Sequence, residues 1–168
     1  MIPMRLFNLS LALTLAAVLL TAQQPAGKGK AAPQPPKEFA SAADVQAMIA
    51  KAKNDRKDGQ AIVNQNILRL APYQANLEYR ASVGTASQHD TEAEMFYVVE
   101  GSGTLVTGGT MPGATKTGDN WTGPSIEGGN SRAVGKGDFI MVPEKTPHWF
   151  SKIEGVLVLM SIHLPHTN

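Results

Sequence analysis

Two imidazoles and one carboxylate are the side chains of this sequence whose types and spacing best suit a metal ion. His89 and Glu94 lie close together, directly before the apolar run 95–99. His148 follows a second apolar run, 139–142, and a turn. Neutral imidazoles and carboxylates bind divalent transition metals, and a three-ligand set leaves coordination positions open for a substrate or for dioxygen. We therefore predict that His89, Glu94 and His148 share one metal site.

Apolar residues near these ligands are candidates for the wall of a pocket. Side chains alternate between two faces along a strand, so an inward Glu94 places Phe96 and Val98 on the same inner face. By the same alternation, His148 shares its face with Phe150. These apolar side chains either line the pocket or pack in the core below it.

The elements that must position these residues are short strands. Beyond residue 59 the sequence has runs of Val, Ile, Leu and aromatic residues separated by Gly, Pro, Asn and Ser, which is typical of all-β domains. Eight such strands suit a closed barrel or a two-sheet jelly roll. The interval 108–129, rich in Gly and Thr, is expected to be a long loop near the barrel mouth, and Trp121 is a pocket candidate if this loop folds over the mouth. The predicted strands are 61–70, 74–82, 94–99, 103–107, 131–134, 138–142, 148–153 and 156–163.

One amphipathic helix is predicted within residues 38–58, before the first strand. Ser41 and Asp44 have the spacing of a capping box. An apolar stripe at helical spacing follows, and we expect it to pack on the domain or on a second subunit. The stripe consists of Val45, Met48, Ile49 and Ala52.

Residues 1–22 predict a signal peptide. A short basic start is followed by the apolar run 6–20, which is shorter than the roughly 20 residues that span a bilayer, and by small residues suited to cleavage. Residues 23–37 contain Pro, Ala, Gln, Gly and Lys without a large apolar side chain, which predicts a disordered spacer. We therefore expect a periplasmic or secreted protein with no membrane attachment after cleavage.

Charge and cysteine content limit the function classes. Cleavage of the leader would remove Arg5 and no acid, which leaves 14 basic and 14 acidic residues. A neutral chain gives no electrostatic basis for binding nucleic acid. The chain has no cysteine, so an exported domain of this size must be held by its core or by a ligand.

Residues 59–168 resemble a single-domain bacterial cupin. The first cupin motif has two histidines separated by a single residue, followed by a glutamate and then a glycine. His89, Glu94 and Gly101 match this motif from its second histidine onward. The resemblance implies a cupin jelly-roll β-barrel, preceded here by one short N-terminal α-helix.

The second cupin motif matches at Gly137, Pro143 and His148. Two positions depart from it. Lys145 stands where the family has a glycine, which requires either a turn without positive φ or a strained one. Lys152 stands where the family has asparagine.

Ser87 stands where the first motif has its first histidine, and it is expected to face the pocket. Three arrangements remain open. The three predicted ligands hold a metal, with a water in the vacated position. Alternatively, Glu92 or Gln88 supplies a substitute ligand, or the polar groups bind a small molecule without metal. Nitrogen and oxygen ligands do not distinguish Fe, Mn, Ni and Zn.

The resemblance implies two functions of different classes. One is an exported metal-dependent enzyme that oxygenates, isomerises or decarboxylates a small polar organic molecule. The other is a non-catalytic, metal-free module that binds a sugar or another small ligand, and a structural role in assembly at the cell envelope is also open. Cupins commonly pair, which implies a homodimer.

Several other residues are expected to lie outside the site. His163 and His166, at the end of the last strand, are expected on the rim. Arg80 is expected to be exposed to solvent, and Gly101 and Gly103 to form a hairpin turn after the first motif.

Overall fold

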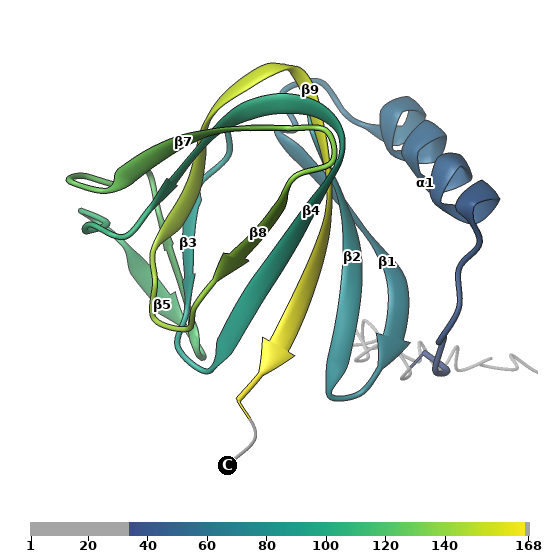
Figure 1. Ribbon diagram of the computed structural model, residues 1–168, viewed down its shortest axis with the longest axis horizontal. Coiled ribbons are helices and arrows are strands. Elements are labelled where there is room, and N and C mark those ends of the chain that lie inside the picture. Colours follow the sequence, from purple (N-terminus) through teal and green to yellow (C-terminus); the bar gives the residue numbers. More distant parts are fainter. Residues whose placement is uncertain (1–33, 167–168) are drawn as a thin grey trace, which may run out of the picture. The chain divides into compact units, whose positions relative to one another are not determined.

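The computed structural model describes residues 34–166. The predicted signal peptide and most of the spacer lie outside these residues. The described chain forms one helix and nine strands, which curl around one another beside the helix (Figure 1). Within these residues, no helix has the length and apolar character that crossing a bilayer requires.

The helix is α1 (Ala42–Asp55). The strands are β1 (Ile62–Leu70), β2 (Tyr73–Arg80), β3 (Ala86–His89), β4 (Glu92–Thr107), β5 (Thr115–Thr117), β6 (Asn120–Gly123), β7 (Asn130–Gly135), β8 (Phe139–Val142) and β9 (His148–Pro165).

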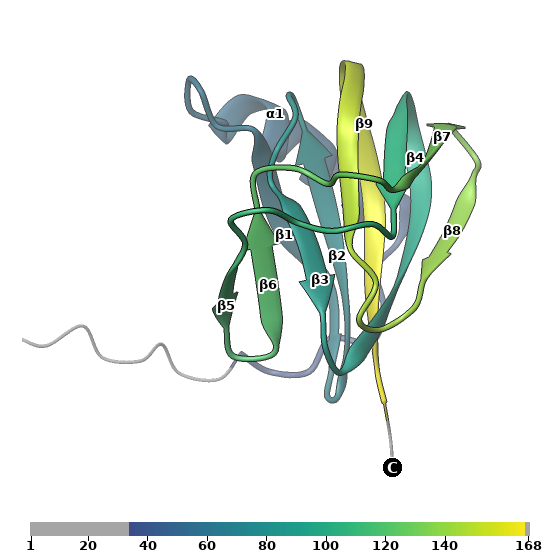
Figure 2. The ribbon, with the colours of Figure 1, turned by 90° about the vertical axis from the view of Figure 1, so that its left-hand side faces the viewer.

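The long strands β4 and β9 run through both sheets of the jelly roll and join them. The first half of β4 pairs with the second half of β9, and the remaining halves pair with each other. The first sheet has the order β1-β2-β9-β4-β8, and the second has the order β5-β6-β3-β9-β4-β7. Figure 2 looks onto β5 and β6 of the second sheet.

The predicted strands 94–99 and 103–107 are one continuous strand, β4, and the expected hairpin turn at Gly101 and Gly103 is wrong. Gly101 has φ 83° and lies where the pairing of β4 shifts register. The positive φ of a glycine lets the strand bend from one sheet into the other instead of reversing direction. The predicted strands 148–153 and 156–163 are joined in the same way into β9.

Three short strands are missing from the sequence-based prediction. β5 and β6 pair with each other inside the interval 108–129, which is therefore not a single long loop. β3 was not predicted because its sequence, Ala-Ser-Gln-His, has no run of apolar residues. Pairing with β6 and β9 places β3 in the sheet despite its weak intrinsic preference for a strand.

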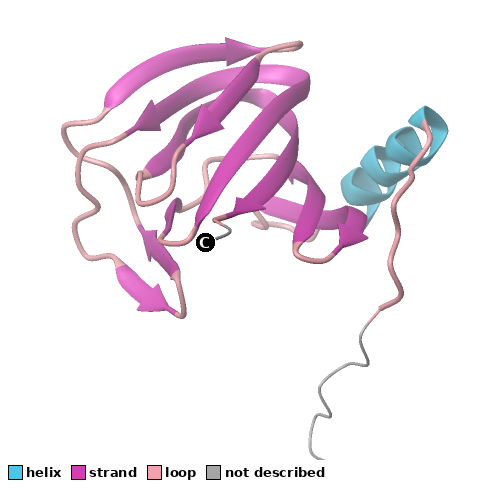
Figure 3. Ribbon diagram, turned by 60° about the horizontal axis from the view of Figure 1, so that its bottom comes forward, coloured by secondary structure: helices cyan, strands magenta, loops and turns pink. Residues whose placement is uncertain are grey.

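The helix packs on the outer face of the first sheet, at the side of the barrel strands (Figure 3). The predicted capping box is present: the Ser41 hydroxyl accepts from the Asp44 backbone N–H, and the Asp44 carboxylate accepts from the Ser41 N–H. Ala52 is fully buried against this sheet, and the rest of the apolar stripe packs around it. The stripe is thus covered by the protein's own domain.

The barrel interior is a separate apolar cluster between the two sheets. It is formed by the buried side chains of Phe96, Val98, Leu105, Val134, Val142, Phe150, Leu157 and Leu159. This core ends at the polar residues described next.

Candidate metal centre

The structure brings the three predicted ligands together at a buried carboxylate. Nε2 of His148 lies 3.0 Å and Nε2 of His89 3.1 Å from the same oxygen, Oε2 of Glu94. Glu94 lies on the part of β4 that belongs to the first sheet. His89 lies on β3 and His148 at the start of β9, and both of these segments belong to the second sheet. The site therefore lies between the two sheets.

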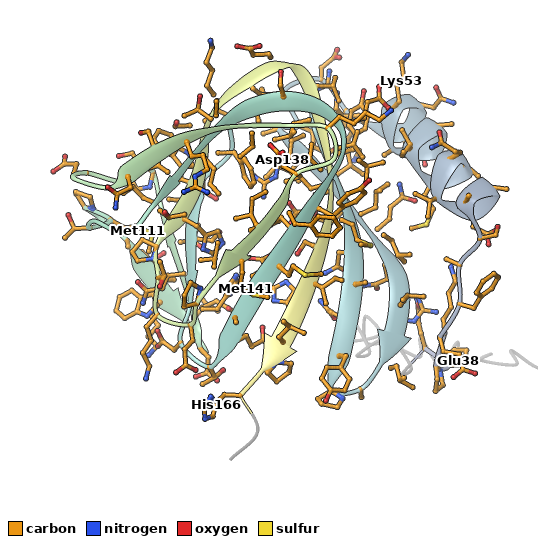
Figure 4. All side chains as sticks on the ribbon, in the orientation of Figure 1. Glu38, Lys53, Met111, Asp138, Met141 and His166 are labelled. Carbon is orange, nitrogen blue, oxygen red and sulfur yellow. The ribbon has the colours of Figure 1, made fainter. Side chains whose placement is uncertain are left out.

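A third imidazole, that of His163, also belongs to this site. Its Nε2 lies 3.5 Å from Oε1 of Glu94, and its ring is 5.0 Å from that of His89, centroid to centroid. Ligand atoms of His89, Glu94 and His163 all lie within 4.8 Å of one another. The expected rim position of His163 is wrong, whereas His166 is exposed at the end of the described chain (Figure 4).

His163 could not be recognised from the sequence because its position depends on the register of two strands far apart in the chain. It lies directly opposite Glu94 in the β4–β9 pair. Side-chain alternation along β9 is visible in the sequence, but the residue of β4 that it faces is not. Ser87, which stands at the position of the first motif histidine, pairs with His148 on the inner face of β3. The third imidazole of this site is that of His163, which comes from β9 and not from β3.

Each of the three imidazoles is oriented by an oxygen at its Nδ1 atom. The partners are Oδ1 of Asn120 for His89 (2.5 Å), the carbonyl oxygen of Thr146 for His148 (3.1 Å) and Oε2 of Glu92 for His163 (2.9 Å). These oxygens only accept hydrogen bonds, so Nδ1 carries a hydrogen and Nε2 is the atom that faces Glu94, where it either donates a second hydrogen or, in the neutral ring, offers a lone pair to a metal. Metal-binding histidines show this pattern of outer hydrogen bonds.

The charge of Glu94 makes this arrangement suitable for a cation. Burial acts to raise the pKa of Glu94, but hydrogen bonds from His148 and His89 outweigh it and hold the pKa well below its usual range. The Ser161 hydroxyl donates to the other carboxylate oxygen. A divalent cation can replace the Nε2 protons that make these hydrogen bonds, and it would then lie between the imidazoles and the carboxylate. The donor set therefore fits a transition metal.

Of the two substitute ligands considered for the Ser87 position, only Glu92 lies beside the site. It accepts the hydrogen bond from Nδ1 of His163 and so orients a ligand. The amide of Gln88 donates instead to the Asp90 carboxylate, at 3.2 Å, on the opposite face of β3 from His89.

Trp121 does not cover the barrel mouth, contrary to expectation. It pairs with Gln88 on the outer face of the second sheet, and its Nε1 donates to Asp90 at 3.0 Å. The Lys116 ammonium group lies 5.2 Å from the centre of its ring. Side-chain alternation explains the difference, because Asn120, the preceding residue, is the one that contacts His89.

The apolar pocket candidates form the floor of the site and the core beneath it. The Phe96 ring lies 5.8 Å from that of His148 and meets the Phe150 ring edge to face at 5.4 Å. Val98 is fully buried further along the same face of β4. Phe96 is thus the member of this set nearest the imidazoles.

Arg80 is buried inside the barrel, so its expected exposure to solvent is wrong. Its guanidinium lies 4.6 Å from the centre of the Phe150 ring, and its Nε donates to Glu78 at 2.8 Å. Tyr79 packs on the opposite face of the strand with the helix. The charge of Arg80 is compensated by Glu78.

The turn before His148 has a positive φ at Lys145, so it is the strained turn and not the alternative without positive φ. Lys145 has φ 59°, and it is the one non-glycine residue with positive φ in the part of the chain that the structure describes. Its backbone N–H donates to the carbonyl oxygen of His89 at 2.6 Å. The lysine therefore keeps the backbone shape that a glycine would adopt without strain.

Replacement of Lys145 by glycine is expected to stabilise the protein. Relief of the left-handed conformation gives about 1–2 kcal/mol, partly offset by about 0.5–1 kcal/mol of glycine chain entropy. The melting temperature, followed by circular dichroism, should rise by roughly 1–4 °C. Lys136→Gly, in the exposed turn before β8, is the matched control and should lower it; a similar fall in both variants would contradict the strain at Lys145.

Comparison with known proteins identifies the fold. No family model and no curated protein matches the sequence. A Bacillus halodurans protein superposes with a TM-score of 0.51 and 15% identity over 79% of this chain and 84% of that chain. The iron(II) form of HppE superposes with a TM-score of 0.50 and 15% identity over 65% of this chain.

The present chain covers 54% of HppE, about half its length. KdgF from a Halomonas species has a TM-score of 0.48 and 17% identity over 67% of this chain and 86% of that chain. The structural neighbours are cupin-fold proteins, so the predicted fold class, a cupin jelly roll preceded by one short helix, is confirmed.

Proposed function

We propose that the protein is an exported, metal-dependent cupin enzyme that acts on a small polar organic molecule. One divalent transition metal, Fe, Mn, Ni or Zn, would be held by Glu94, His89, His148 and His163. The observation that carries this proposal is the convergence of three Nδ1-anchored imidazoles on one buried carboxylate.

The residues around the metal have separate tasks in this proposal. Bound metal supplies Lewis acidity to a substrate oxygen or to water, and a redox-active ion also supplies electron transfer. Glu94 offsets the charge of the ion, and Phe96 excludes water from the side of the core. Ser87 lies on the inner face of β3 opposite His148, and its short side chain occupies less space than a histidine would. Oxygenation, isomerisation and decarboxylation all suit this arrangement.

Metal content is the direct test. The mature chain, residues 23–168, is produced by export without a His tag or chelator and analysed for its elements. About one equivalent of a transition metal is expected, with loss in His148→Ala and retention in the exposed control His166→Ala. Absence of metal after reconstitution with Fe, Mn, Ni and Zn would overturn the proposal.

His163 distinguishes the structure-based ligand set from the three ligands predicted from sequence. His163→Ala is expected to weaken metal binding by at least about tenfold. Loss of a residue that only orients a ligand typically weakens binding by about tenfold to a hundredfold. A competition titration with a chromophoric chelator measures the affinity, and His166→Ala should leave it unchanged. Equal affinities of wild type and His163→Ala would remove His163 from the centre.

A metal-free binding module is the second candidate, and the site contains one observation that favours it. Burial lowers the pKa of His89, but its hydrogen bonds with Glu94 and Asn120 outweigh this and raise it. A protonated His89 can therefore satisfy Glu94 without metal. Binding of a small ligand that is unchanged after complete metal removal would support this candidate.

We also propose that two copies pair. The helix stripe is covered, but β8 exposes Met141, which is 54% exposed (Figure 4), and Phe139, which is 70% exposed. The Tyr97 ring lies 4.6 Å from that of Phe139. This apolar surface suits a second subunit. A monomer by size-exclusion chromatography with light scattering at micromolar concentration would contradict pairing.

Export is tested separately, by fractionation of cells that express the chain with and without residues 1–22.

A further inference from the structure

A row of directly opposed residues crosses the first sheet from the metal centre to the edge of the sheet. In order, the row consists of Val142, Glu94, His163, Gln74, Arg69 and Lys37. Directly opposed residues of antiparallel strands place their side chains on the same face. Gln74 and Arg69 therefore share the inner face with His163, and the row ends in two cationic residues.

Arg69 has a donor that the protein leaves unsatisfied. Its Nε is the one buried side-chain nitrogen or oxygen among residues 34–166 that has no hydrogen-bond partner. A buried donor without an acceptor costs about 1–3 kcal/mol, more when it is charged. Because Nε is shielded from solvent, an anion would approach the guanidinium at its terminal nitrogens rather than at Nε.

A cavity lies at this position. It has a volume of about 270 Å³ and is lined by Arg69 and Gln74 together with Pro36 and Tyr73, among others. The next residues on the same face are also polar: the Asn66 amide donates to Asn76 at 2.5 Å, and Asn76 lies opposite Ser161. The surface between Arg69 and the metal centre can therefore solvate a polar molecule.

We infer that Arg69 and Gln74, with Lys37 beside them, form a subsite for a carboxylate or phosphate group of the molecule whose other end reaches the metal centre. The planar guanidinium pairs with either group through two parallel hydrogen bonds. The link to the metal rests on the proposed function, whereas anion binding at Arg69 stands without it.

The spacing of the strands sets the length of such a molecule. Neighbouring strands lie about 4.8 Å apart, so the backbone of Arg69 is roughly 10 Å from that of His163. A small organic anion with a second polar group can span this distance. Arg80, the other arginine on the inner face of this sheet, is already paired with Glu78 and is not available for the same role.

Inorganic phosphate and acetate, titrated by calorimetry at pH 8 into metal-free protein, test the subsite directly. One binding site is expected, and the tighter of the two probes identifies the preferred group. Arg69→Gln should weaken binding by at least about tenfold, as expected for loss of a charge-assisted pair. Arg132→Gln, an exposed arginine on β7, is the matched control and should change the affinity less than about twofold.

The connection to the metal centre is tested with linear dicarboxylates of increasing length. Metal-loaded protein is expected to bind those long enough to span the row more tightly than metal-free protein does, and Arg69→Gln should abolish this gain. A gain that persists in Arg69→Gln would overturn the link.

The possible outcomes separate this subsite from the proposed function. Equal phosphate and acetate affinities of wild type and Arg69→Gln, or a larger loss in Arg132→Gln, would overturn the subsite even if metal binds. Anion binding that depends on Arg69 in a protein that takes up no metal would support the subsite and reject the metal-dependent function. If Arg69→Gln does not fold, Arg69→Lys, which keeps the charge but loses the paired hydrogen bonds, decides by the same tenfold criterion.

Discussion

Replacement of Glu94 by alanine is expected to weaken metal binding by at least about a hundredfold, beyond the usual effect of residues that only orient ligands. Glu94 supplies the anionic oxygen nearest to Nε2 of His89 and of His148. Without the carboxylate, three neutral imidazoles must hold a divalent ion with no anionic ligand in direct contact with it. Metal content after dialysis and a chelator competition both report the loss.

Two further variants separate charge from shape in this prediction. Glu94→Gln keeps the size of the side chain but removes its charge, and it should lose most of the affinity. Glu100→Gln removes an exposed carboxylate from the same strand and should change nothing. Retention of metal by Glu94→Ala within about threefold of wild type would show that the carboxylate is not a ligand.

Gly101→Ala is expected to destabilise the protein by about 4 kcal/mol or more, in the range reserved for severe backbone conflicts. A Cβ atom at this position would lie 1.8 Å from the carbonyl oxygen of Val156, and the backbone φ is 83°. Neither strand can move away without breaking the bend of β4. A loss of this size is a large part of the 5–15 kcal/mol typical of a folded domain.

Gly108→Ala provides the matched comparison for Gly101→Ala. Gly108 also has a positive φ, 74°, but a Cβ there would have no atom within 4 Å. Its cost should be limited to the conformational strain, about 1–2 kcal/mol. Urea denaturation of both variants measures the difference, and similar losses would contradict the close approach at Val156.

The fold class could be predicted from the sequence because motif spacing and apolar periodicity are local properties. The same is true of the capping box at Ser41 and Asp44, which joins residues three apart. The continuity of β4 was missed because a glycine reads as a turn unless its neighbour in space is known. The polar strand β3 was missed because pairing with other strands, rather than its own composition, keeps it extended.

The site was only partly predictable, for a related reason. His89, Glu94 and His148 could be proposed because each belongs to a recognisable motif next to an apolar run. His163 and Arg69 have no such context. Each gains its position from the register of antiparallel strands, in which a shift by one residue would turn the side chain to the opposite face.

The hydrogen bond from the Lys145 N–H to the His89 carbonyl has a consequence for the kinetics of metal uptake. It fastens the turn that carries His148 to the strand that carries His89, and the Thr146 carbonyl in the same turn fixes the His148 ring. The ligands are thus preorganised by the backbone before an ion arrives. If the proposed metal binds here, little chain entropy remains to be lost, and we expect loading to be a single bimolecular association step that is not coupled to folding.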